Sequence, residues 1–240
     1  MQRLDRYLSE AGVESRRKIK DIVKAGRVSV NGTVIRNPEI KIDETKDEIW
    51  LDGKCISRAS RRIVLMMHKP AGCVTAARDP DFPTVMEHLP PEYKKLMPVG
   101  RLDKDTEGLL LFTNDGDLAH RLLAPKNRIE KTYYAEHLGV AGEADVTAFR
   151  EGCTLKDGTV CLPAGLEILS DGKCLVRVVE GKYHQVRRML ASRGLPVSYL
   201  RRISEGCVTL GDLPVGKTRE LTEEEIVRLE SVHFDEKNST

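Results

Sequence analysis

The residues best suited to chemistry lie in a short charged turn within VGRLDKDTEGLLLF, at 99–112. Three carboxylates, Asp103, Asp105 and Glu107, come just before an apolar run at 109–112. Such a run predicts a buried strand, and a charged turn at the mouth of that strand can hold a carboxylate rigidly near a substrate. A solvated, capped turn has the same composition, so the rest of the chain must decide between the two interpretations.

Two other segments carry residues of chemical interest, KTYYAE at 131–136 and EGKYHQVRRML at 180–190. A tyrosine on a strand usually belongs to a core, and a basic helix start is usually a solvated end. Each segment alone is therefore weak evidence of a site.

Hydrophobic periodicity between residues 62 and 232 predicts the elements that would position these segments. We expect strands in RIVLMMHKP (62–70), LLLFTN (109–114), KTYYAEHL (131–138), LEIL (166–169) and CLVRVVEG (174–181), and helices in DLAHRLLA (117–124), GEADVTAFREG (142–152) and HQVRRMLASRG (184–194). Strands and helices do not alternate regularly, so the predicted fold class is α+β with a mixed, largely antiparallel central sheet. After Leu221 we expect one short helix and then a frayed tail at 233–240.

The first 60 residues read as a separate small domain, ahead of a larger one at 61–232. Helical spacing predicts helices at 4–11 and 16–25, each followed by a glycine, with Ser15 as a good N-cap for the second. Asn31-Gly32 between alternating residues is a strong hairpin signal. The segment ISRASRRI, at 56–63, reads as a linker.

Composition excludes several classes of protein. The 240 residues contain no apolar run long enough to span a membrane, and the charged N-terminus lacks the apolar core of a signal peptide. Six cysteines form no CxxC pair, which argues against a zinc site or a disulfide framework. We therefore expect a cytoplasmic protein with free, mostly buried thiols and no metal site.

Charge is unevenly distributed along the chain. Residues 1–62 hold 15 Lys/Arg and 10 Asp/Glu, whereas residues 219–240 hold three basic and seven acidic side chains. A basic front unit joined to a nearly neutral body predicts a polyanionic partner engaged at one end.

The helix–helix–hairpin order of the front unit, SRRKIKDIVKAGRVSVNG in particular, resembles the small RNA-binding module named after ribosomal protein S-four. The resemblance covers about the first 50 residues. It implies that Arg16, Arg17 and Lys20 face RNA phosphates, which positions a protein without reading sequence.

Two further segments, HKPAGCVT and PVGRLDKDTEGLL, extend the resemblance to the whole chain. The chain resembles the pseudouridine synthases, specifically the branch typified by the small-subunit rRNA enzyme RsuA. The resemblance implies that Asp103 is the catalytic aspartate, that Tyr133 stacks on or abuts the target base, and that Arg187 is the cation paired with the aspartate. It also suggests Lys69 and Arg101 as contacts to the RNA backbone.

The reaction so implied breaks the bond from uracil N1 to the ribose, turns the ring and rejoins it through C5. A carboxylate can serve this reaction as a nucleophile or as a base, and both roles stay open for Asp103. The reaction is redox-neutral and needs no cofactor. We expect base flipping, a monomeric enzyme, and ribosomal RNA or a subunit assembly intermediate as the partner.

Three alternatives remain. A non-catalytic RNA-binding protein would not need Asp103. An RNA methyltransferase would need a Gly-rich cofactor loop, which the glycines here do not form. The same reaction on large-subunit rRNA is the closest competitor, and the Tyr-His of Lys182-Tyr183-His184 favours the small subunit by family resemblance.

Overall fold

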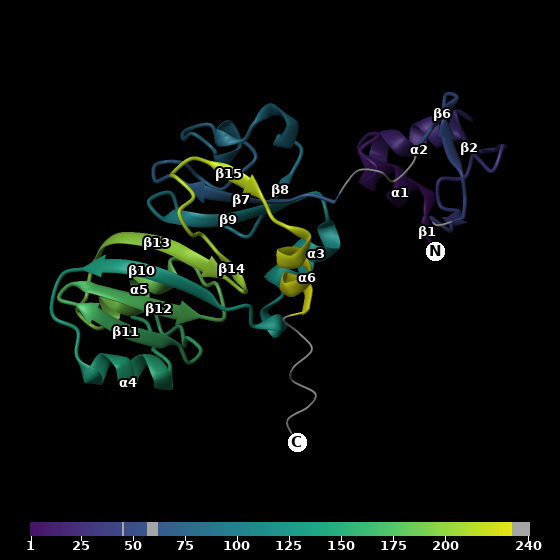
Figure 1. The fold of residues 1–240 in the computed structure, drawn as a ribbon. Helices are drawn as coiled ribbons and strands as arrows, with labels where there is room; N and C mark the ends of the chain where they lie inside the picture. Colours follow the sequence, from purple (N-terminus) through teal and green to yellow (C-terminus); the bar gives the residue numbers. More distant parts are fainter. Residues whose placement is uncertain (45, 57–61, 232–240) are drawn as a thin grey trace, which may run out of the picture. The chain divides into compact units, whose positions relative to one another are not determined.

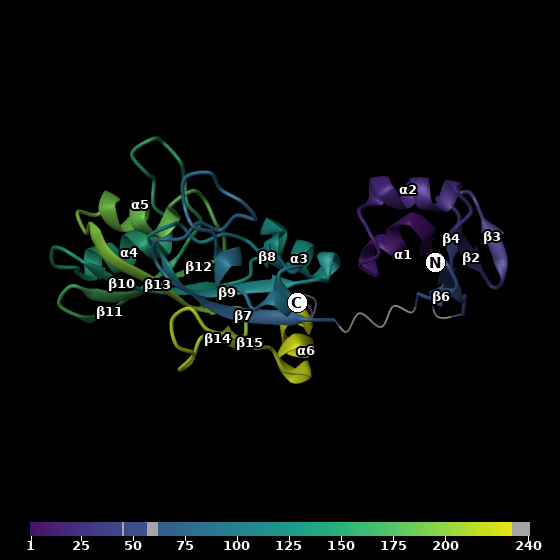
Figure 2. The same cartoon turned by 90° about the horizontal axis from the view of Figure 1, so that it is seen from above.

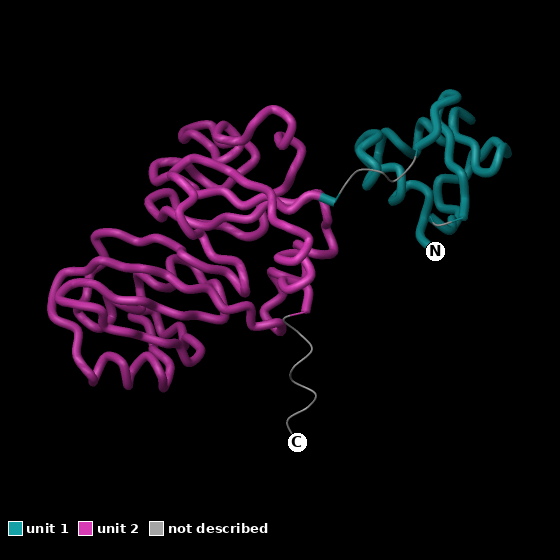
Figure 3. The backbone as a smooth tube through the Cα atoms, viewed as in Figure 1, with its two compact units in different colours: residues 1–62 teal, residues 63–240 magenta. Residues whose placement is uncertain are grey.

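The computed structural model describes residues 1–44, 46–56 and 62–231 of the chain. The chain divides into two compact units, Met1–Arg62 and Ile63–Thr240 (Figure 3). Most of the linker expected at 56–63, and the tail expected at 233–240, lie outside the described residues.

The first unit contains the two helices and the hairpin that the sequence predicts. Its elements are β1 (Gln2–Arg3), α1 (Leu4–Glu10), α2 (Arg16–Lys24), β2 (Val28–Val30), β3 (Thr33–Ile35), β4 (Lys41–Ile42), β5 (Ile49–Leu51) and β6 (Lys54–Cys55). Asn31 and Gly32 both take positive φ values, 49° and 79°, as a two-residue hairpin turn of the type I′ class requires. Ser15 stands at the N-cap of α2, but its side chain makes no capping hydrogen bond.

The second unit is an α+β domain, drawn with the first in Figure 1. Its elements are β7 (Val64–Lys69), η1 (Val85–His88), η2 (Pro91–Tyr93), β8 (Met97–Val99), β9 (Glu107–Thr113), α3 (Gly116–Leu123), η3 (Pro125–Asn127), β10 (Lys131–His137), α4 (Glu143–Glu151), β11 (Gly165–Ser170), β12 (Lys173–Val178), α5 (Gln185–Ser192), β13 (Val197–Glu205), β14 (Val208–Thr209), β15 (Thr218–Glu220) and α6 (Glu223–Ser231). Each strand and helix expected in this domain is present, within a few residues of the predicted bounds.

Among the described residues, the strands of this domain form one nine-stranded sheet. Seven strands follow the order β11-β12-β10-β13-β9-β7-β15, while β14 pairs with β13 and β8 pairs with β9. The pairings are antiparallel, except that β13 runs parallel to β9. Viewed from above, α4 and α5 lie on one side of the sheet and α6 on the other (Figure 2). The sheet is thus mixed and mostly antiparallel, as predicted.

The strands β7 and β9 are buried on both faces, which explains why their sequences are continuously apolar rather than alternating. One face packs against α3 and α6, and the other against the segment that connects β7 to β8. The residues of the first face are Val64, Met66, Leu109 and Leu111, and those of the second are Leu65, Met67, Leu110 and Phe112.

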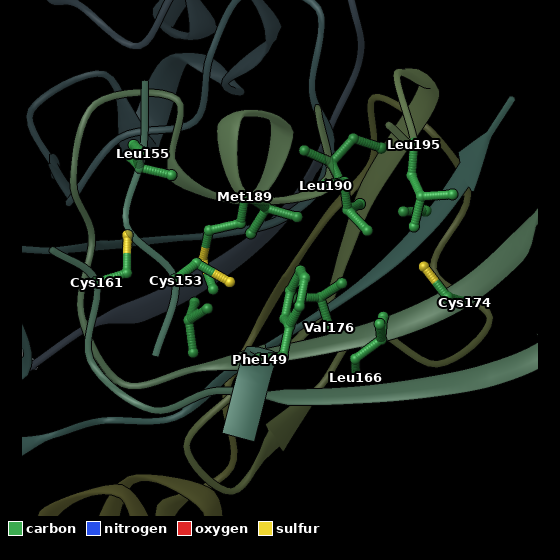
Figure 4. Packing of buried hydrophobic residues seen from close by; sticks show 14 residues of the cluster. Phe149, Cys153, Leu155, Cys161, Leu166, Cys174, Val176, Met189, Leu190 and Leu195 are labelled. Carbon is green, nitrogen blue, oxygen red and sulfur yellow. The ribbon is translucent and has the colours of Figure 1, made fainter. Parts of the chain in front are cut away.

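A second core lies between β10–β12 and the helices α4 and α5, around Phe149 (Figure 4). It contains the thiols of Cys153, Cys161 and Cys174 among aliphatic side chains. All six cysteines are free and four of them are buried, as expected. Burial raises the pKa of the Cys174 thiol to about 11, so this group is an inert part of the core.

The longest strand, β13, was not predicted from the sequence, yet it joins the two halves of the sheet. Gly108 makes the junction possible: a Cβ at this residue would lie 2.2 Å from the carbonyl oxygen of Arg202, and φ is +111°. Only a glycine allows such a close approach of two backbones. None of the described helices is both long and apolar enough to cross a membrane.

Candidate active site

The turn that carries Asp103 connects β8 to β9. Gly100 opens it with φ +77°, and the Thr106 N–H closes it by donating to the Asp103 carbonyl oxygen at 3.1 Å. The Asp103 side chain is 32% exposed, so its carboxylate is half-buried and still accessible. The turn therefore presents the Asp103 carboxylate to solvent, just before the start of β9.

Lys69 holds this turn from below. The residue ends β7 and is fully buried, and its ammonium donates to the carbonyl oxygens of Asp103, Lys104 and Thr106 at 3.1, 3.3 and 3.0 Å. A fourth bond, to the Pro70 carbonyl, is 2.9 Å long. Burial lowers the pKa of the Lys69 ammonium, while nearby acidic groups oppose that shift. The expectation that Lys69 contacts RNA backbone is therefore wrong for this structure, because its ammonium is buried and donates its hydrogen bonds to the protein's own carbonyls.

The segment after β7 braces the turn from a second side. The Thr75 hydroxyl donates to the Leu102 carbonyl at 2.9 Å and accepts from the Leu102 N–H at 3.1 Å. The Gly72 N–H donates to the Lys104 carbonyl at 2.8 Å. Lys104 in turn places its ammonium 3.6 Å from the centre of the Phe82 ring. The position of Asp103 is thus fixed by its neighbours rather than by the turn alone.

Tyr133, on β10, lines a pocket that Asp103 also lines. Its ring packs against the core around Phe149 and against the core beneath the segment that connects β7 to β8. Burial raises the pKa of its hydroxyl, and the positive charge of Arg202 acts in the opposite direction. The phenol is therefore neutral at physiological pH. Its place in the pocket fits the predicted role as an aromatic neighbour of the target base.

A buried ion pair on β13, which the sequence analysis missed, lies beside Tyr133. The Arg202 guanidinium is 3.2 Å from Glu205 Oε2, and both side chains are at most 2% exposed. Arg202 Nε also donates to the Leu109 carbonyl at 2.7 Å. Burial lowers the pKa of Arg202 but the Glu205 charge raises it, and the net shift is upward. The pair is neutral as a whole, and it places the Arg202 guanidinium beside the Tyr133 hydroxyl.

We expect Glu205→Gln to lower the free energy of unfolding by about 3 kcal/mol, because it leaves the buried Arg202 charge without its partner. Urea denaturation measures the change. The matched control is Glu167→Gln, which removes the exposed ion pair with Arg177 and should cost less than about 1 kcal/mol. Equal effects of the two substitutions would contradict this assignment.

Arg187, the predicted counter-charge of Asp103, lines the pocket from α5 but is not paired with that carboxylate. Its guanidinium donates to the backbone carbonyl of Asp105 at 3.1 Å. Within the described residues, the group at ion-pair distance from Asp103 is His184, whose Nε2 is 3.5 Å from Asp103 Oδ1. The expected Asp103–Arg187 pair is therefore absent from this structure, although the two residues share one pocket.

The pocket is small and open to solvent, with a volume of about 70 Å³, below the usual range of about 300–1,000 Å³ for closed small-molecule sites. Asp103, Tyr133, His184 and Arg187 line it, and the exposed Arg101 stands at its edge. The remaining lining residues are Leu102, Thr106, Val178, Glu180, Gly181, Lys182, Gln185, Val186 and Leu200. A carboxylate, an aromatic ring and two basic side chains thus converge on one pocket that is open to solvent.

The three basic residues predicted to face RNA in the first unit lie on α2. Arg16, Arg17 and Lys20 are exposed, whereas Ile19 and Val23 on the same helix are buried in the core of that unit. This placement leaves their side chains available to a polyanion.

Comparison with known proteins agrees with this arrangement of an RNA-binding module and a carboxylate pocket. The pattern of the RNA pseudouridylate synthase family matches residues 63–192, and that of the S4 domain matches residues 2–49. The chain therefore belongs to the RNA pseudouridine synthase family. It is an isomerase that acts on RNA, built from an S4 domain followed by a pseudouridine synthase domain.

Similar proteins extend over nearly the whole chain. An uncharacterized RNA pseudouridine synthase of Bacillus subtilis is 40% identical, covering 93% of this chain and 96% of its own. The ribosomal small subunit pseudouridine synthase A of Pasteurella multocida is 39% identical (93% and 97%), and the ribosomal large subunit pseudouridine synthase B of Bacillus subtilis is 35% identical (100% of both). A crystal structure of a pseudouridylate synthase superposes with a TM-score of 0.69 at 34% identity, covering 95% of this chain and 100% of that one.

Proposed function

We propose that this enzyme converts a uridine of small-subunit ribosomal RNA into pseudouridine, with Asp103 as the catalytic group. The observation that carries the proposal is the convergence of Asp103, Tyr133 and Arg187 on one pocket. Three small-subunit synthases at 35–39% identity support the choice of RNA, together with the Tyr183-His184 pair beside the site. The enzyme would act as a cytoplasmic monomer, on free rRNA or on an assembly intermediate.

In this proposal the target uridine leaves its stack and enters the pocket. Asp103 either attacks the nucleotide or takes a ribose proton, and the bond from N1 to C1′ breaks. Tyr133 supports the detached uracil while the ring turns. A new bond joins C5 to C1′ as the bond from Asp103 to the nucleotide breaks, or as Asp103 returns the ribose proton. C5 then loses its proton, and N1 gains one. The number of atoms and electrons is unchanged, so no co-reactant is consumed.

Arg187 would pair with Asp103 only when RNA is bound. Its present hydrogen bond goes to the carbonyl of Asp105, in the same turn as Asp103. A nucleotide that enters the pocket would displace this bond, and the Asp103 carboxylate is then a stronger partner for Arg187 than a backbone carbonyl. Arg101, Arg16, Arg17 and Lys20 would contact phosphates outside the pocket.

A second candidate substrate is large-subunit rRNA, because the Bacillus subtilis large-subunit synthase matches this chain over its full length. Mapping of pseudouridines in both rRNAs, from cells with and without the gene, separates the two. We expect the deletion to remove one pseudouridine from small-subunit rRNA and the wild-type gene, but not its Asp103→Asn variant, to restore it. A loss confined to large-subunit rRNA would replace the proposed substrate, and no loss in either rRNA would overturn the ribosomal assignment.

A further inference from the structure

We propose that the stacked side chains of Tyr183 and His184 form a platform for the nucleobase that neighbours the target uridine. The inference rests on the proposed placement of the target base next to Asp103. The two rings lie 3.9 Å apart at their centres, with an interplanar angle of 16°. Tyr183 is 75% exposed, which leaves most of its ring in contact with solvent.

An exposed aromatic ring is unusual in this chain. Among the described residues, the strongly exposed aromatic side chains are Phe82 and Tyr183, and the Lys104 ammonium already covers the Phe82 ring. Burial of an aromatic ring is a large source of stabilisation, so a ring left in water next to a reaction pocket gains most when a flat ligand covers it. A nucleobase is such a ligand, and stacking accepts any base because every base has a π-face.

The loop that presents Tyr183 is rigidly held. The buried Gln185 accepts the Lys182 N–H at 2.9 Å and donates to Glu180 Oε1 at 2.8 Å. Glu180 also accepts the Leu162 N–H at 2.9 Å and pairs with the Lys182 ammonium. His184 takes φ +48°, a strained value for a residue with a side chain, so its surroundings must impose it. A ring held in place before binding loses little conformational entropy when a base stacks on it.

The location of the pair selects the neighbour of the target rather than the target itself. His184 lines the pocket, with Nε2 3.5 Å from Asp103 Oδ1, whereas Tyr183 stacks on its outer side and does not line the pocket. When the uridine enters the pocket, the adjoining base loses its stacking partner at the pocket mouth. Tyr183 would replace that partner and hold the RNA strand open.

The test uses an RNA oligonucleotide that contains the uridine converted by the wild-type enzyme, whichever rRNA it comes from. We expect Tyr183→Ala to weaken the affinity for this RNA about 5- to 150-fold, the range reported for loss of one base–aromatic stack. The single-turnover rate at saturating enzyme should change less than about threefold, and Tyr183→Phe should resemble the wild type because the ring remains.

A double-mutant cycle with the RNA then identifies the contact. The base on the 5′ or the 3′ side of the uridine is replaced by an abasic nucleotide. At one of these positions we expect the wild type to lose the same factor in affinity that Tyr183→Ala loses, and the variant to lose nothing further. Full additivity at both positions, a loss in Tyr183→Phe equal to that in Tyr183→Ala, or an affinity that Tyr183→Ala leaves unchanged would each overturn the platform while leaving the proposed reaction intact. Failure of Asp103→Asn to affect turnover would instead overturn the proposed function.

Discussion

Replacement of Asp103 by asparagine is expected to slow pseudouridine formation by about 10²–10⁴-fold or more, and to change RNA affinity less than about threefold. The lower range applies if Asp103 is a general base, and larger losses are typical of a nucleophile. Asparagine has almost the same shape but carries no negative charge, so it neither attacks a sugar nor accepts a proton at neutral pH. Tritium release from C5-labelled uridine in RNA, at saturating substrate, measures the rate.

The control for this experiment is Asp105→Asn, in the same turn. Asp105 is exposed, and the contact that the structure gives it is made by its backbone carbonyl to Arg187. The substitution keeps that carbonyl and removes one nearby negative charge, so the rate should stay within about threefold of wild type. A rate for Asp103→Asn equal to that of this control would exclude Asp103 as the catalytic residue and favour a binding role for the pocket.

Most of the fold follows from signals that are local in the sequence. The Asn31-Gly32 turn, the apolar run of β9 and the N-cap at Asp115 each depend on a few neighbouring residues. The Asp115 carboxylate accepts from the N–H groups of Asp117 and Leu118 at 3.0 and 2.9 Å, so it caps the N-terminus of α3. Local preferences of this kind predict the folded structure correctly, because the tertiary contacts reinforce rather than oppose them.

The strand β13 escaped prediction because its sequence, VSYLRRISE, places charged residues where a strand usually places apolar ones. Arg202 and Glu205 point inward as an ion pair, and the bond from Arg202 to Leu109 joins segments 93 residues apart. Charged residues are almost never fully buried unless they are paired, and pairing is a property of the tertiary structure. No local pattern reveals it.

Some members of the site were predictable from the sequence, but their contacts were not. The family resemblance named Asp103, Tyr133 and Arg187 as site residues, and in the structure all three line one pocket. The partner of Asp103 depends on side-chain rotamers and on the left-handed backbone of His184, which places the imidazole rather than the guanidinium near the carboxylate. A positive φ is uncommon in any residue other than glycine, and no local pattern in the sequence assigns one to His184.

Lys69 shows why a charged residue at a strand end is ambiguous. From the sequence, HKPAG reads as the exit of a strand, where a lysine is normally solvated. Burial becomes favourable only because the turn at 103–106, more than thirty residues later, supplies three of the carbonyl oxygens that surround the ammonium. The assignment of Lys69 to RNA binding failed for this long-range reason.

Lys69→Met is accordingly expected to damage both stability and catalysis. Methionine fills a similar volume but donates no hydrogen bonds, so the buried carbonyls around the ammonium lose a shared partner, at about 1–3 kcal/mol for an unsatisfied group. Because those carbonyls belong largely to the catalytic turn, Asp103 should shift relative to the substrate, and a displacement of about 1 Å can reduce the rate about 100-fold. Urea denaturation and single-turnover rates on the same RNA measure the two effects.

The matched control is Lys94→Met, because Lys94 is exposed and donates to one backbone carbonyl, that of Met86. That variant should stay within about 0.5 kcal/mol of wild type in stability and keep its full rate. If Lys69 instead bound RNA phosphate, Lys69→Met would weaken RNA affinity, reduce the dependence of binding on salt by about one ion and leave the rate at saturation unchanged. The opposite pattern, a lower rate at saturation with affinity and salt dependence preserved, is the one that a buried lysine holding the Asp103 turn must produce.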